Sequence, residues 1–176
     1  MGDVLKIGRR YSGDPIPPVP ERTTWIDAGG LRFGIEFRVL NDAIINAEFD
    51  SRDEKSVQVD GALPEEDLVG FDSRGVSIHV SDALDGGEYL RFDAFDGDPH
   101  YHYLTPGVGH TVIIFDDAAL GDMFPWTFHC LRDRLPQMLT MAGAGDLVDR
   151  IDIADVHAAL PEIERVAERA LTPAQG

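Results

Sequence analysis

The chain has 176 residues, 43% of them hydrophobic, which suits one domain with its own core and leaves little room for two. Its formal net charge is −17, which disfavours binding to a nucleic-acid backbone or to an anionic membrane surface. No apolar run reaches the ~18 residues of a membrane-spanning helix or marks a signal peptide. The single cysteine, Cys130, cannot form an internal disulfide, so we expect an acidic cytoplasmic protein.

Residues 1–22 are predicted to form a separate proline-rich arm. Pro15, Pro17, Pro18 and Pro20 lack the backbone N–H that helices and sheets require, so polyproline-II is the expected conformation. The arm is expected to lie on the surface of the domain or on a neighbouring subunit. Either this arm or the C-terminal helices could hold a homodimer together.

Residues 23–116 are predicted to form an antiparallel sheet. Between Leu31 and Val39 apolar side chains alternate with polar or small ones, which is typical of a strand with one buried face. Residues 40–50 are ambiguous between a strand continuation and a short helix. A helix is expected to start at Pro64, where a proline precedes two glutamates.

The clearest predicted hairpin spans residues 76–96, around a three-residue turn that contains two glycines. Opposed residues of two paired strands share one face of the sheet, which restricts the register. The predicted register places Val80 opposite Phe92 on the apolar face. It places His79 opposite Asp93 on the polar face.

After residue 116 the apolar period changes from two to that of a helix. Apolar side chains recur at helical spacing from Phe124 to Leu135 and again from Ile153 to Ala170. Residues 118–172 are therefore predicted to be helical. Strands first and helices last predict an α+β fold, with one domain over residues 23–176 and the helices packed on one face of an antiparallel sheet.

A histidine cluster gives the strongest indication of a functional site. His100 and His102 are two positions apart on a predicted strand, so both imidazoles project from one face and can reach a single ion. His110 follows a turn and is predicted to be the third metal ligand, with His79 as the other candidate for this position. The ion would be a divalent transition metal such as zinc, iron or manganese, which can activate a bound water.

A metal-free alternative uses the same face of the sheet. His79 and Asp93 would form a general base and the carboxylate that orients it. Arg91 would hold an anionic substrate, and Tyr89, Tyr101 or Tyr103 would donate a proton. The competing structural interpretation is an ordinary polar sheet face, with Tyr101 and Tyr103 packed inward.

The segment from Glu88 to Tyr103 resembles a strand pair found in small bacterial proteins whose domain has no assigned function. Within it, Arg91-Phe92-Asp93 followed by Pro99-His100-Tyr101-His102 looks like the Tyr-Asp…Pro-His-x-His strand of TumE-type toxins of bacterial toxin–antitoxin systems. The second resemblance implies a toxin-like ribonuclease acting on RNA.

Three classes of function remain open at this point. The preferred class is a small-molecule enzyme, metal-dependent or based on histidine acid–base chemistry, and it predicts a concave pocket where His79, Asp93 and the His100–His102 pair converge. The second class is a non-catalytic interaction or assembly protein, which predicts a flat or covered face. The third class is the toxin-like ribonuclease, which the acidic composition disfavours.

Overall fold

The computed structural model describes residues 7–51, 59–60 and 72–172, and the helix start expected at Pro64 lies outside these ranges. The elements in chain order are β1 (Arg9–Ser12), a short 3-10 turn (Pro20–Arg22), β2 (Thr24–Ala28), β3 (Leu31–Asn41), α1 (Asp42–Ser51), β4 (Val59–Asp60), β5 (Asp72–Asp82), β6 (Glu88–Phe95), β7 (His100–Thr105), β8 (Gly109–Ile114), α2 (Asp117–Leu120), α3 (Met123–Asp133), α4 (Leu135–Met141), α5 (Gly145–Val148) and α6 (Ile153–Leu171).

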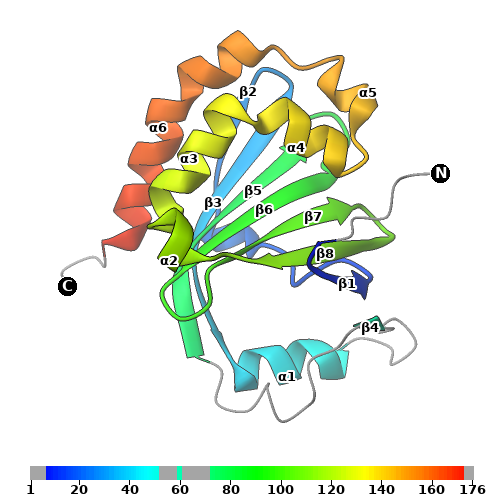
Figure 1. The fold of residues 1–176 in the computed structure, drawn as a ribbon, viewed down its shortest axis with the longest axis vertical. Coiled ribbons are helices and arrows are strands. Elements are labelled where there is room, and N and C mark those ends of the chain that lie inside the picture. Colours follow the sequence, from blue (N-terminus) through cyan, green and yellow to red (C-terminus); the bar gives the residue numbers. More distant parts are fainter. Residues whose placement is uncertain (1–6, 52–58, 61–71, 173–176) are drawn as a thin grey trace.

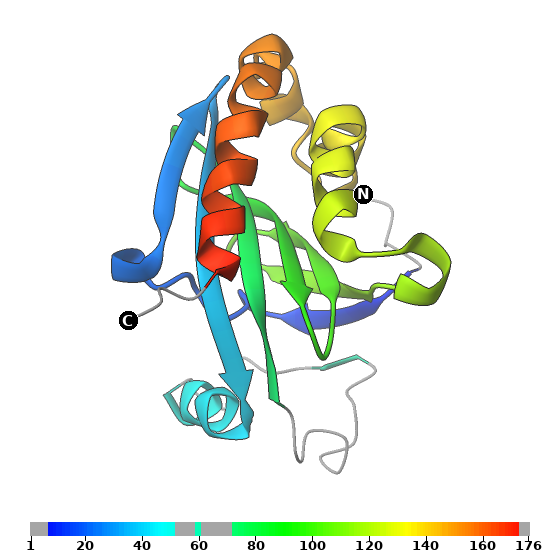
Figure 2. The ribbon, with the colours of Figure 1, turned by 90° about the vertical axis from the view of Figure 1, so that its left-hand side faces the viewer.

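The described strands form one antiparallel sheet in the order β2-β3-β5-β6-β7-β8-β1-β4. Helices α3–α6 follow the strands in sequence and lie together over one face of the sheet (Figures 1 and 2). The predicted α+β class is confirmed. The ambiguous stretch 40–50 contains the end of β3 and most of α1, which lies apart from the other long helices (Figure 1).

The hydrophobic core lies between the sheet and the C-terminal helices. Alternate residues of β3 point into it, and Leu31, Phe33 and Ile35 are almost fully buried there. On α6 the buried residues recur every three or four positions, which gives one apolar helix face. They are Val156, Leu160, Ile163 and Ala167. None of the described helices is long and apolar enough to cross a lipid bilayer.

The pairing predicted for the β5–β6 hairpin is wrong by two residues. His79 lies opposite Arg91 and not opposite Asp93, and Val80 lies opposite Leu90 and not opposite Phe92. A shift of two residues keeps every side chain on its predicted face, because side chains alternate with period two. The faces were therefore predictable, and the partners were not.

The turn of this hairpin explains the shift. The Asp82 carboxylate accepts a hydrogen bond from the Leu84 N–H at 2.9 Å, so the chain turns before the residues that the prediction placed in the loop. The register also shifts at a bulge between Val80 and Ser81. Gly86 adopts a φ of 77° and completes the turn.

The proline-rich arm lies across the polar face of its own sheet. Residues 9–12 of the predicted arm form β1, which pairs with β8, whereas β2 pairs with β3 several strands away. The connecting residues 13–22, which we call the strap, must cross the intervening strands. The strand within the arm was not predicted; the four prolines come after it, so they do not prevent residues 9–12 from pairing.

Candidate metal centre

The face of the sheet opposite the helices buries an unusual set of charged and polar side chains. Charged and polar side chains are rarely buried unless they form hydrogen bonds or ion pairs. The following are among those that are at most 7% exposed: Glu36, Arg38, Ser77, His79, Arg91, Asp93, His100 and His102. This polar face contains most of the residues that the sequence analysis selected.

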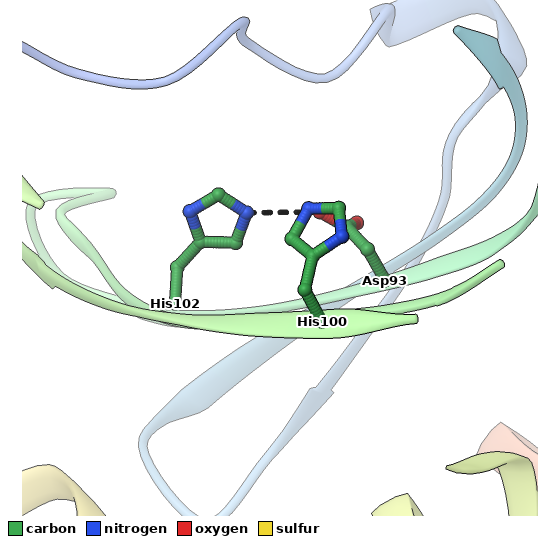
Figure 3. Close-up of side chains that lie close together, drawn as sticks. All are labelled: Asp93, His100 and His102. Carbon is green, nitrogen blue, oxygen red and sulfur yellow. Dashed lines mark hydrogen bonds and ion pairs between the residues drawn. The ribbon is translucent and has the colours of Figure 1, made fainter. Parts of the chain in front are cut away.

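Asp93 on β6 is the centre of the histidine cluster (Figure 3). Its Oδ2 atom lies 3.1 Å from Nε2 of His100 and 3.0 Å from Nε2 of His102, both on β7. Its Oδ1 atom accepts a short hydrogen bond from the Ser77 hydroxyl. All three clustered side chains project from the same side of the sheet, because His100 and His102 alternate with residues of the other face.

His100 is oriented by a second contact. Its Nδ1 atom donates a hydrogen bond to the Asp98 carbonyl at 2.7 Å, which leaves Nε2 directed at the Asp93 carboxylate. A carboxylate oxygen only accepts, so this approach is favourable only with a proton or a metal ion on Nε2. Burial alone would lower the pKa of His100, but the hydrogen bond and charge of Asp93, with help from Asp98, raise it.

His102 differs from His100 in the direction of its pKa shift. Burial lowers the pKa of His102 to about 3, and the nearby positive charges of His100 and Arg91 contribute in the same direction. Asp93 opposes this shift and does not outweigh it. The imidazole is therefore neutral near pH 7, the form that binds metal ions, and its Nδ1 atom is buried without a hydrogen-bond partner among the described residues.

The carboxylate of Asp93 stays ionised in this setting. Burial would raise its pKa, but its contacts with His100 and His102 hold the pKa well below its usual range. The site therefore offers one anionic oxygen and two imidazole nitrogens, whose candidate ligand atoms all lie within 4.8 Å of one another. Two ligand atoms at right angles on an ion, each about 2.1 Å away, are about 3.0 Å apart, close to the spacing of the carboxylate oxygen from each imidazole nitrogen.

His110, the predicted third ligand, is beside this group but not part of it. It lies on the same face of the sheet, and its ring centre is 5.2 Å from that of His102. Its Nδ1 atom makes a 2.9 Å contact with the Gly13 carbonyl on the strap. Asp93, predicted as a partner of a catalytic base, occupies the third position of the cluster instead.

Tyr101 and Tyr103, predicted as proton donors on the histidine face, lie on the opposite side of the sheet. Tyr101 packs against Trp126 of α3 and Phe92, and Tyr103 is buried in the core. The alternation of β7 that brings the two histidines together necessarily turns the tyrosines toward the helices. Burial raises the pKa of Tyr103 to about 12.

His79 and Arg91 are on the polar face as predicted, but their contacts differ from the predicted ones, which were Asp93 for His79 and a substrate anion for Arg91. The Nδ1 atom of His79 lies 2.7 Å from Glu88 Oε1, and its Nε2 atom lies 3.2 Å from Glu36 Oε1. Both contacts are hydrogen bonds at the same time only when the ring carries two N–H groups. The Nε and Nη2 atoms of Arg91 donate to Glu88, so this arginine is already paired with a carboxylate.

Glu36 and Glu88 were missed by the sequence analysis. Glu36 is at a polar position of the alternating β3 segment, which places it on the polar face, but its proximity to His79 depends on the β3–β5 pairing. Glu36 and His79 are 43 positions apart in the sequence. No local pattern in the sequence predicts this pairing.

A groove elsewhere on the molecule contains none of the predicted site residues. It lies at the start of β5 and the end of β6, near the start of α3 and the end of α6. Phe37, Ala94, Phe95, Met123 and Phe124 contribute to its lining. Of the four residues predicted to converge in a pocket, Asp93, His100 and His102 lie together, whereas His79 contacts Glu36 and Glu88 instead, and none of the four lines this groove.

The fold and site define an α+β domain with a buried cluster of two histidines and one carboxylate on the sheet face that the helices leave free. The chain belongs to the DUF7700 family, described as a domain of unknown function, whose profile matches residues 25–167. No curated protein and no solved structure matches the chain.

Proposed function

We propose that Asp93, His100 and His102 bind one divalent transition-metal ion, with zinc, iron(II) and manganese(II) as candidates. The observation that carries this proposal is the orientation of His100. Its Nδ1–H is committed to a backbone carbonyl, and its Nε2 atom is directed at a carboxylate oxygen. A backbone acceptor on the outer nitrogen is the usual support of a metal-ligating histidine.

The donor set also indicates a reactive rather than a purely structural ion. Structural zinc sites are generally closed by four protein ligands, whereas two histidines and one carboxylate leave positions open. This set is typical of non-haem iron(II) sites that bind a substrate or co-substrate at the open positions. We therefore propose a metal-dependent enzyme acting on a small molecule.

Metal titration of the chelator-treated, full-length protein tests the proposal. Isothermal titration calorimetry with zinc, manganese(II) and, under anaerobic conditions, iron(II) is expected to show one ion bound with Kd below about 0.1 mM, or −5.5 kcal/mol. Replacing both ligand histidines, His100→Ala with His102→Ala, is expected to abolish binding. His110→Ala is the matched control, because it removes a neighbouring imidazole outside the cluster.

The alternative occupant of the site is a proton shared between His100 and Asp93. It predicts no stoichiometric metal binding to the wild-type protein. That result contradicts the proposal, and so does metal binding that survives in the double histidine variant. Asp93→Asn tests the carboxylate separately, because it keeps the size of the side chain and removes the anionic ligand. Loss of a residue that only supports a metal ligand weakens metal binding about 10–100-fold, and Asp93→Asn is expected to weaken it at least as much.

A further inference from the structure

Two buried arginines converge on the backbone of the strap. Arg38 Nη1 and Arg91 Nη1 donate to the same acceptor, the Ile16 carbonyl oxygen, at 3.3 and 2.7 Å. Arg38 Nη2 donates to the next carbonyl, that of Pro17, at 3.3 Å. Three guanidinium nitrogens thus lie around two successive carbonyl oxygens.

The remaining contacts of these arginines point into the sheet. Arg91 donates through Nε and Nη2 to Glu88, and Arg38 Nε lies 3.2 Å from Glu36 Oε1. The carboxylates therefore fix the orientation of both guanidinium groups. Only the nitrogens described above are directed outward, toward the strap.

A pair of peptide carbonyls satisfies these donors less well than a carboxylate would. A carbonyl oxygen is neutral, whereas hydrogen bonds from a guanidinium to an anion are shorter and about twice as strong. The two arginines are also close enough for their charges to repel. Burial lowers the pKa of Arg38, and the charge of Arg91 is the next largest contribution in the same direction.

The location of this arginine pair connects it to the histidine cluster. In the β6–β7 ladder Arg91 lies directly opposite His102, and Asp93 is two positions along the same strand. A small anion held by Arg91 would therefore lie next to the cluster, on the same face of the sheet. A divalent ion there would add further positive charge.

We propose that Arg38 and Arg91 form a binding site for a carboxylate group of a small organic molecule, and that the Ile16 and Pro17 carbonyls of the strap occupy this site in the structure described here. Carboxylate binding needs only the arginines and so does not depend on the metal. Its role as the substrate group of a metal-dependent reaction rests on the proposed function.

The strap is built to be displaced without unfolding the sheet. Its prolines have no N–H groups to pair, so residues 15–20 contact the sheet through the Ile16 and Pro17 carbonyl oxygens and through the Val19 N–H, which donates to Glu36 at 3.1 Å. At the start of the strap, the Gly13 N–H donates to the Val108 carbonyl and the Asp14 carboxylate accepts from the Gly107 N–H, beside the β7–β8 turn. β1 and β2 anchor its two ends in the sheet. Displacement would therefore lift a loop and leave both flanking strands in place.

Titration of succinate into the chelator-treated, full-length protein tests the carboxylate site in the absence of metal. Succinate is expected to bind, and the uncharged isostere succinamide is not. Arg38→Gln is expected to weaken succinate binding about tenfold or more, because it removes one guanidinium fork. Pro17→Gly combined with Pro18→Gly is expected to tighten it about threefold or more, because a looser strap competes less well for the arginines.

Three results would overturn this inference: no succinate binding, equal binding of succinamide, or unchanged affinity in the strap variant. Binding of inorganic phosphate in preference to succinate would reject the carboxylate class. If Arg38→Gln lowers the melting temperature, its weaker succinate binding could reflect partial unfolding. The strap variant, Pro17→Gly with Pro18→Gly, then tests the carboxylate site, because it leaves both arginines intact. The metal titration is separate, so failure of the metal site and failure of the carboxylate site are distinguishable.

Discussion

Glu88 holds together the charged half of the polar face. It accepts hydrogen bonds from Arg91 Nε and Nη2, both at 2.8 Å, and its Oε1 atom lies 2.7 Å from His79 Nδ1. Burial alone would raise the pKa of Glu88, but the Arg91 charge and hydrogen bonds, with His79, lower it from 4.5 to about 2. Its ionised form is therefore the one that the folded protein stabilises.

This shift predicts a specific loss of stability in acid. Because the folded pKa of Glu88 lies below the unfolded value, its contribution is fully present above pH 4.5 and is lost as the pH falls to about 2. A shift of this size is equivalent to about 3 kcal/mol of unfolding free energy. Urea unfolding from pH 7 to pH 2 should show Glu88→Gln less stable than wild type at neutral pH, with the difference shrinking below pH 4.5. A difference that stays constant over this range would contradict the assignment.

At single positions, the sequence predicted which residues face the polar side of the sheet better than it predicted their partners. Alternation places His79, Asp93 and His100 correctly on one face, because it depends only on strand geometry. The partner of each residue depends on register, which a turn controls. The same alternation turns Tyr101 and Tyr103 to the helices, so the two tyrosines could not share a site with His100 and His102.

At the level of elements, the β2–β3 turn is joined to the start of α6. The Asp152 N–H donates to the Gly29 carbonyl at 2.9 Å, and Asp152 also caps α6 through hydrogen bonds from the N–H groups of Ala154 and Asp155. Gly29 has a φ of 59°. A β-carbon there would lie 2.2 Å from the Asp152 carbonyl oxygen.

Two glycine substitutions distinguish the cost of an unfavourable backbone conformation from the cost of a steric clash in the hairpin turns. Gly86→Ala, at a φ of 77° with open space around it, should cost only the left-handed backbone penalty of about 1–2 kcal/mol. Gly29→Ala should cost distinctly more, because the new methyl group must also displace the backbone at Asp152. Chemical denaturation of both variants measures the difference. Equal costs would show that the turn and α6 can move apart freely.

The succession of elements was predictable because their periods differ so clearly. The alternation of β3 and the three-to-four spacing of α6 each identify an element and its buried face. The start of α1 was ambiguous. The hairpin register was not predictable. The two glycines predicted a turn that begins at Asp85, whereas the Asp82 carboxylate accepts a hydrogen bond from the Leu84 N–H and starts the turn earlier.

At the level of the whole molecule, the sheet separates two environments. The helices cover an apolar face, and the strap covers a face with buried arginines, carboxylates and histidines. The net charge of −17 is a property of the whole sequence and says nothing about the side chains on this buried face. The path of the strap was not predictable, since the contact between Ile16 and Arg91 joins residues 75 positions apart.

The most direct test of the metal centre is anomalous diffraction from crystals of the full-length protein loaded with cobalt(II) or zinc. Data collected above and below the absorption edge of the metal locate the ion independently of activity. The account predicts one strong anomalous peak about 2.1 Å from Asp93 Oδ2 and from the Nε2 atoms of His100 and His102. Peaks only at exposed carboxylates, or no peak between these three side chains, would contradict it.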